Sequence, residues 1–263
     1  MKENTSAQHE SKQIDNAPLL IPVCGTLTLR ESLRQRTDAV VLLDPRGLHA
    51  ESVQRAERRF LDFYSHAASL AESNGGEPLF LCPTTLSAPA PLAKAPRPFF
   101  SRELLLSQLT ALLRVSAVAR MAPILPYADS GEHFHALHAL LDTAMCALFE
   151  QDVPFDELLP VGALPASFEI LAKADLLLEE ADFLLIDTDL PWTGSNATLL
   201  SLLRKGIAQA HQMGRPVLLY GARALAPTLL PELLAAGIDG LCLPPDASGN
   251  CFGKERLIFQ GIT

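Results

Sequence analysis

Residues 216–244, "PVLLYGARALAPTLLPELLAAGIDGLCLP", decide the fold. The two apolar runs at 216–221 and 238–244 are short, continuous and bounded by proline or glycine, as expected of strands that are buried on both faces of a parallel sheet. The segment between them, 227–237, has apolar residues at helical spacing and closes at Gly237, a favourable helix C-cap. The stretch therefore predicts a strand, a helix and a second strand.

The same alternation continues over the rest of the chain. Helical periodicity with charged opposite faces is found at 51–73, 101–120, 130–151 and 196–214. Six more short apolar runs lie at 19–25, 39–44, 78–83, 121–127, 158–164 and 182–187. Eight strand candidates alternating with helices predict an α/β fold, a (β/α)8 TIM barrel. Residues 245–263 are short and irregular, so we expect the last helix to be missing or shortened.

The competing fold is an open doubly wound sheet. It is weakened because the sequence has no Gly-rich phosphate loop: residues 249–254, "GNCFGK", are one residue short of a P-loop and are not framed by a strand and a helix. We expect a disordered N-terminal tail at 1–17, one barrel domain at 18–247 and an irregular C-terminal tail at 248–263.

Composition limits the classes of function. The formal net charge of -9 over 263 residues argues against a nucleic-acid or membrane partner, because both need a basic surface. The five cysteines form no CxxC pair, and the polar first residues contain no apolar core of a signal peptide, so we expect a reduced, cytoplasmic protein. No uninterrupted apolar stretch reaches the roughly 18 residues that span a bilayer.

Several side chains are candidates for a metal or thiol site. Asp187 and Asp189 end the apolar run at 182–187, where acids are often metal ligands in α/β enzymes. Cys24 and Cys242 end the first and eighth strands, which are neighbours in a barrel, although a small buried hydrophobe is the favoured interpretation of each.

A further candidate metal site is the group of His133, His135 and His138. The last two share a helix face, but no matching acid is evident, so a packed or solvated helix start is favoured.

Three parts of the chain resemble the C-terminal, phosphoenolpyruvate-binding barrel of Enzyme I of the sugar phosphotransferase system. The likeness covers roughly residues 19–247 and rests on the order of the segments. Its stretches are "SRELLLSQLTALLRVSA" with "MAPILPYADSGEHFHAL", "LLPVGALPASFEILAKA" with "ADFLLIDTDL", and "LLRKGIAQAHQMGRPVLLYGARA" with "LLAAGIDGLCLP". The resemblance implies arginines on the second and third strands for the substrate, a Glu and an Asp on the fifth and sixth strands for Mg²⁺, and a Cys proton donor on the seventh.

The resemblance places other residues at most of these positions. Asp44 aligns with the arginine of the second strand, and Arg46, two residues on, is a candidate replacement. Cys82 aligns with the arginine of the third strand. Ala166 aligns with the glutamate of the fifth strand, and Tyr220 aligns with the cysteine of the seventh strand. Only the sixth strand keeps an acid, Asp189, the candidate metal ligand, while Asp187 falls on a glycine.

The expected function is accordingly that of an inactive Enzyme I-like barrel, a pseudoenzyme that acts as a regulatory or scaffolding partner. No cofactor is expected, and Mg²⁺ only if the site keeps residual activity. Because the family barrel is a dimerisation domain, the resemblance implies a homodimer or a heteromer with an active phosphotransferase. The alternative is a divergent phosphoenolpyruvate-protein phosphotransferase or lyase that acts on a small phospho- or oxo-acid through Asp187, Asp189, Tyr220 and Arg46.

Overall fold

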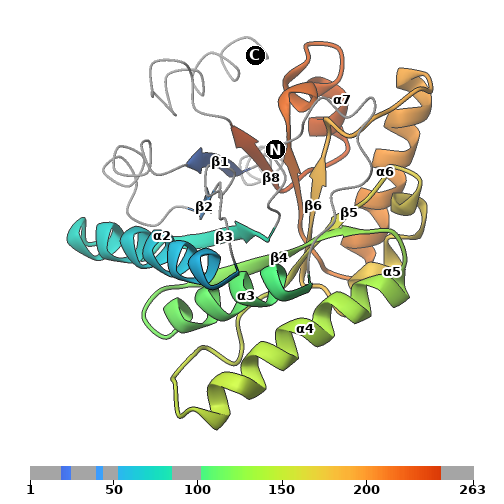
Figure 1. Cartoon of the computed structure of the whole chain (residues 1–263). Helices are drawn as coiled ribbons and strands as arrows, with labels where there is room; N and C mark the ends of the chain where they lie inside the picture. Colours follow the sequence, from blue (N-terminus) through green and yellow to red (C-terminus); the bar gives the residue numbers. More distant parts are fainter. Residues whose placement is uncertain (1–18, 25–39, 44–52, 85–101, 244–263) are drawn as a thin grey trace, which may run out of the picture.

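The computed structural model describes residues 19–24, 40–43, 53–84 and 102–243 of the chain (Figure 1). The expected tails, 1–17 and 248–263, lie outside these residues, as do Asp44, Arg46 and the segment in which the last helix was expected to be short or missing. None of the described helices combines the length and the apolarity that a membrane crossing requires.

The described strands close into a parallel barrel in which each strand pairs with its neighbours in the chain and β1 pairs with β8. This closure confirms the predicted (β/α)8 barrel and excludes the open doubly wound sheet. The strands are β1 Leu19–Cys24, β2 Val40–Leu43, β3 Leu79–Pro83, β4 Met121–Ala128, β5 Gly162–Pro165, β6 Phe183–Asp187, β7 Val217–Tyr220 and β8 Gly240–Leu243.

The strand predicted at 158–164 is displaced toward its C-terminal end, since β5 begins at Gly162. The residues before it form a turn that is tied to β6. Asp182 accepts the backbone N–H of Val161 at 2.9 Å through its carboxylate and donates its own N–H to the Val161 carbonyl at 2.7 Å. These bonds join Val161, the residue before β5, to Asp182, the residue before β6.

Side chains fill the inside of the barrel. Because strand residues alternate between the two faces of a sheet, every second residue points inward. The inward residues form one buried cluster, drawn from all eight strands, of Ile21, Val23, Leu42, Leu81, Ala122, Ile124, Leu164, Phe183, Leu185, Leu218 and Cys242. The alternate strand residues, such as Val41, Phe80, Leu184 and Leu219, belong to a larger cluster with the helices.

The described helices cover the outside of the barrel (Figure 1). The longer ones are α2 Val53–Ser73, α3 Arg102–Ser116, α4 Gly131–Glu150 and α6 Asn196–Gln212, followed by the short α7 Leu230–Ala235. After β5 the chain makes only a 3-10 turn, η2 Ile170–Lys173, and the four-residue α5 Asp175–Leu178. Another 3-10 turn, η3 Ala222–Leu225, follows β7.

Helix ends agree with the caps that the sequence contains. Ser130 and Ser195 are N-caps whose hydroxyl oxygens accept the backbone N–H groups of His133 and Thr198. Gly214 and Gly237 follow α6 and α7 with φ angles of 69° and 84°, a left-handed conformation that glycine adopts without steric cost.

Candidate functional site

The C-terminal ends of β6 and β7 bring Asp187 and Tyr220 together. The two residues are register partners on these neighbouring strands. Asp187 lies two residues after Leu185 and Tyr220 two residues after Leu218, so both side chains point to the inside of the barrel, and Tyr220 packs against the interior cluster. Two of the three predicted ligand-binding candidates, Asp187 and Tyr220, therefore lie at the mouth of the barrel, the end where barrels of this architecture carry their active sites.

Ala166 lies directly after β5 at the same end. Its backbone N–H donates to the carbonyl of Ala128, the last residue of β4, at 2.9 Å. The methyl side chain brings no oxygen to a position where the resemblance implies a metal-binding carboxylate. Glu169, three residues on, precedes η2 and is exposed, and its side chain makes no capping bond.

Asp189 has a structural role in the loop after β7. Its two carboxylate oxygens accept the backbone N–H groups of Ala222 at 2.8 Å and Arg223 at 2.9 Å, which are the first residues of η3. The neighbouring carboxylate of Asp187 accepts the N–H of Asp189 at 2.9 Å and so fixes the turn. The acid that the resemblance aligns with a metal ligand therefore caps a 3-10 turn.

Thr188 and Gly221 complete this arrangement. The buried hydroxyl of Thr188 donates to the carbonyl of Tyr220 at 2.9 Å and accepts the N–H of Ala224 at 3.0 Å. Gly221 has a φ of 109°, and a Cβ atom there would lie 2.7 Å from Oγ1 of Thr188 and 2.9 Å from Cγ of Asp189. The loops after β6 and β7 are thus joined by contacts too close to admit a side chain.

Cys82 points away from the mouth. It is fully buried and belongs to the cluster between the barrel and the helices, near Tyr64 of α2. Burial raises the pKa of the Cys82 thiol far above its ordinary value, and its Sγ donates to the carbonyl of Phe80 at 3.4 Å. The position that aligns with a substrate-binding arginine is therefore part of the core.

Cys24 and Cys242 do not lie opposite each other on their neighbouring strands. The register pairs Cys242 with Ile21 and Cys24 with Leu43, so the two cysteines are offset by three residues, or about 10 Å along the strands. Cys242 is buried in the barrel interior, where burial raises the pKa of its thiol. The favoured interpretation of Cys242 as a buried hydrophobe fits this position, and the register argues against a shared thiol site.

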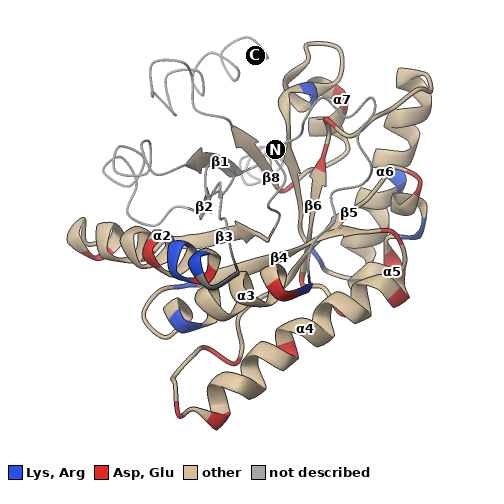
Figure 2. Cartoon of the chain, viewed as in Figure 1, with Lys and Arg blue, Asp and Glu red and all other residues tan. Residues whose placement is uncertain are grey.

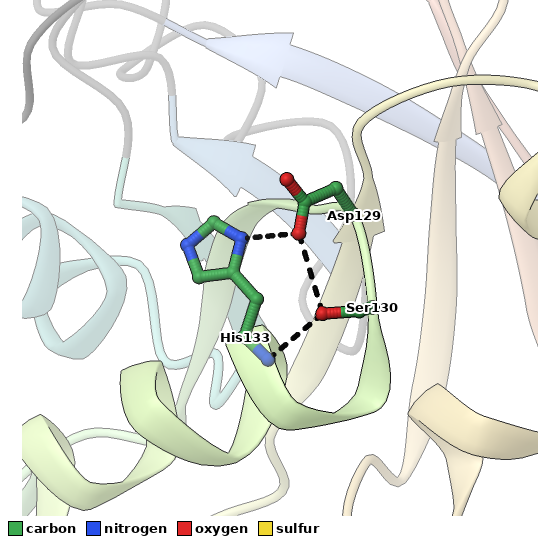
Figure 3. Close-up of polar contacts among 3 residues, drawn as sticks. All are labelled: Asp129, Ser130 and His133. Carbon is green, nitrogen blue, oxygen red and sulfur yellow. Dashed lines mark hydrogen bonds and ion pairs between the residues drawn. The ribbon is translucent and has the colours of Figure 1, made fainter.

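His133 forms a pair that the sequence analysis missed (Figure 3). Its Nδ1 lies 2.9 Å from Oδ1 of Asp129, the first residue after β4, and the hydroxyl of Ser130 lies 3.4 Å from the same oxygen. Because an ionised carboxylate only accepts, Nδ1–H of His133 is the donor in this pair. The signal was the i, i+4 spacing of Asp129 and His133 across a helix N-cap.

The other two histidines also have acid partners, which corrects the expectation that no matching acid is near. His135 pairs with Glu180 at 2.7 Å and His138 with Asp142 at 3.7 Å. Each histidine thus faces a different carboxylate, and within the described ranges no three His, Cys, Asp or Glu side chains are grouped so that they could hold a metal ion. The favoured interpretation, a solvated helix start, fits this geometry.

The barrel and the position of its mouth define a TIM-barrel protein. Solved structures support that class. A thiamine phosphate pyrophosphorylase from Pyrococcus furiosus superposes with a TM-score of 0.51 at 15% identity, over 94% of this chain and 98% of that one. An HpcH/HpaI aldolase from Desulfitobacterium hafniense gives 0.53 at 11% identity, over 94% of both chains. A 2,3-dimethylmalate lyase, a member of the PEP mutase/isocitrate lyase superfamily, gives 0.54 at 13% identity, over 94% of this chain and 82% of that one.

Comparison of the amino-acid sequence with known proteins shows a more specific similarity than the fold does. A phosphoenolpyruvate-protein phosphotransferase of Haemophilus influenzae is 34% identical over 88 residues, which are 34% of this chain and 15% of that protein. The enzyme of the same name from Bacillus sp. (strain S) is 28% identical over 150 residues, 51% of this chain and 26% of the relative. No protein-family model matches the chain. The chain is thus distantly similar to part of phosphoenolpyruvate-protein phosphotransferase, or Enzyme I, and spans about a quarter or less of these relatives.

Proposed function

We propose that this barrel is a catalytically inactive relative of the Enzyme I phosphoenolpyruvate-binding domain and that it acts as a regulatory or scaffolding partner. The observation that carries the proposal is the bonding of Asp189. Both carboxylate oxygens of the aligned metal-ligand position are bonded to backbone N–H groups of η3. A carboxylate held in this way stabilises the loop after β7 without any ion.

The surroundings of Asp189 support the same conclusion. Mg²⁺ needs several oxygen ligands, usually one or two carboxylates together with substrate phosphates. At the end of β5, where the resemblance implies the second carboxylate, the residue is Ala166. The inward Asp187 adds a negative charge at the mouth, which repels a phosphorylated acid. Arg223, which follows β7, directs its guanidinium to the carbonyl of Leu190 at 3.3 Å.

The similarity to these relatives supports a partner role. They are named phosphoenolpyruvate-protein phosphotransferases, and this chain matches only a part of each. We infer that the chain pairs with itself or with an active phosphotransferase. Sedimentation velocity of the chain alone, and of the chain mixed with the phosphoenolpyruvate-protein phosphotransferase of the same genome, tests this role. A dimer or a mixed complex is expected, and a monomer under both conditions would contradict it.

The alternative is a divergent phosphotransferase or lyase, and one observation favours it. Asp187 and Tyr220 are register partners that point into the mouth, so an acid and a phenol could act on one small substrate. Release of pyruvate and inorganic phosphate from phosphoenolpyruvate in the presence of Mg²⁺, with water as the phosphoryl acceptor, separates the two functions. We expect release at the protein-free background. Release that Tyr220→Phe abolishes, while Tyr127→Phe leaves it intact, would establish the alternative.

A further inference from the structure

The end of the barrel opposite the mouth carries three exposed apolar side chains. Val118 follows α3, Phe149 lies in the last turn of α4, and Leu158 lies in the loop before β5, with exposed fractions of 81%, 72% and 91%. Single exposed apolar residues are common on protein surfaces, whereas several at one end of a domain make that end a candidate interaction site. The backbone N–H of Asp156 donates to Oγ of Ser116 at 2.9 Å, which ties the loop after α4 to the end of α3.

The backbone of this loop is held in place, so Leu158 is presented to solvent by a fixed turn. The N–H of Val153 donates to the carbonyl of Leu148 at 3.0 Å, and the N–H of Leu158 donates to the carboxylate of Asp156 at 2.9 Å. The next residue, Leu159, is 5% exposed and anchors the turn in the core. Because the backbone is already fixed, only the side chain loses conformational entropy when a partner covers Leu158.

The negative charge of the same region favours a basic partner. The sequence from Phe149 to Pro160, "FEQDVPFDELLP", contains four acids and no Lys, Arg or His. Figure 2 shows acidic residues at the end of α4 and in the loop that follows. Arg114 at the end of α3 is directed to Glu57 at 3.8 Å, which leaves the exposed Arg120 as a basic neighbour of Val118. A second copy of the chain bound through this same surface would place acids opposite acids, whereas a basic partner would be attracted.

We propose that this surface binds a basic amphipathic helix of a partner protein. We define the surface by the apolar Val118, Phe149 and Leu158 with the exposed acids Glu150 and Glu157. The apolar face of the helix covers Phe149 and Leu158, and its lysine or arginine side chains lie against the acids. The proposal goes beyond the partner role because it names a surface and a partner chemistry, and it does not depend on whether the mouth of the barrel binds a ligand.

The test uses the full chain and a fluorescent synthetic amphipathic helix with leucine on one face and lysine beside it. Anisotropy should show saturable binding, at least about tenfold weaker for the Phe149→Ser, Leu158→Ser double variant, since a few buried apolar groups carry most of an interface's affinity. The control variant is Leu176→Ser with Met213→Ser, two residues that are 41% and 40% exposed elsewhere, and it should bind like the wild type. Glu150→Gln with Glu157→Gln should weaken binding and reduce its dependence on salt.

Four results would overturn the proposal. They are the absence of binding by the wild-type chain, equal binding of a peptide with glutamate in place of lysine, equal losses in the test and control variants, and unchanged binding in the charge variant. A fifth result identifies another occupant. If the Phe149→Ser, Leu158→Ser variant of the chain alone sediments as a smaller species than the wild type, the surface joins two copies of the chain. Circular dichroism of each variant confirms that the fold is intact.

Discussion

Asp189 accepts the backbone N–H of Ala222 at 2.8 Å, and this bond joins the loop after β6 to the start of η3 after β7. A second bond, from the backbone N–H of Arg223 to the other oxygen, means that the carboxylate binds the first two N–H groups of the turn. An acid at the mouth of a barrel is often assigned to chemistry because of its position. Here its hydrogen-bond partners are backbone groups of its own chain, and a stability role follows from them.

Replacing Asp189 with alanine should therefore destabilise the fold. Loss of a capping side chain costs about 1–2 kcal/mol, and Asp189→Asn should cost less because the amide oxygen still accepts one N–H. Urea unfolding followed by circular dichroism measures both changes. Glu169→Ala is the control, an exposed acid at the same end whose side chain caps nothing, and it should change the free energy of unfolding by no more than about 0.5 kcal/mol. Equal stability of Asp189→Ala and the wild type would contradict the capping role.

Gly221 should tolerate no side chain. Its φ of 109° is unfavourable for alanine, and the added Cβ would lie 2.7 Å from Oγ1 of Thr188. We expect Gly221→Ala to cost about 2 kcal/mol or more, from backbone strain and steric overlap together. Gly214→Ala is the matched control, since Gly214 also has a positive φ of 69° but nothing lies within 4 Å of the added atom. Its cost should be about 1 kcal/mol, from the left-handed backbone alone. Thermal unfolding of both variants gives the comparison, and similar losses would show that the close contact is relaxed in solution.

Alkaline pH should destabilise the protein. Burial raises the pKa of the Cys82 and Cys242 thiols above the ordinary value of 9.0. The folded chain therefore keeps protons that the unfolded chain loses above pH 9, so the free energy of unfolding falls as the pH rises through that value. The slope per thiol approaches about 1.4 kcal/mol per pH unit.

Urea unfolding at a series of pH values from 7 to 10 measures this slope. It should be shallower in a Cys82→Ala, Cys242→Ala variant than in the Cys146→Ala control, which replaces an exposed cysteine. A slope that does not depend on the two buried cysteines would contradict their assignment to the core.

The sequence predicted the barrel because its signals are local. Each apolar run is short and ended by a breaker, as at 182–187, where β6 runs from Phe183 to Asp187. The prediction was less accurate at 158–164, where β5 begins only at Gly162. There the apolar run continues through a turn that Asp182 holds from a distance in sequence, a tertiary contact without a local signature.

The candidate site was predicted only in part. Asp187 and Tyr220 do share the mouth, because the ends of neighbouring parallel strands must meet. The role of Asp189 could not be read from "DTDL", since its bonding partners lie more than thirty residues away. The resemblance placed Cys82 at a substrate-binding position, but the alternation of strand residues turns it toward the helices. The Asp129 and His133 pair was visible in the sequence and was missed.

Calorimetric titration of the chain with phosphoenolpyruvate in the presence of Mg²⁺ tests the central claim most directly. If the barrel has kept its fold and lost the site, no heat of binding should appear at millimolar ligand, and thermal unfolding should not shift when ligand is added. Binding at millimolar concentration or tighter that Asp189→Asn removes, and that the control Glu169→Gln retains, would show that the carboxylate still serves a ligand.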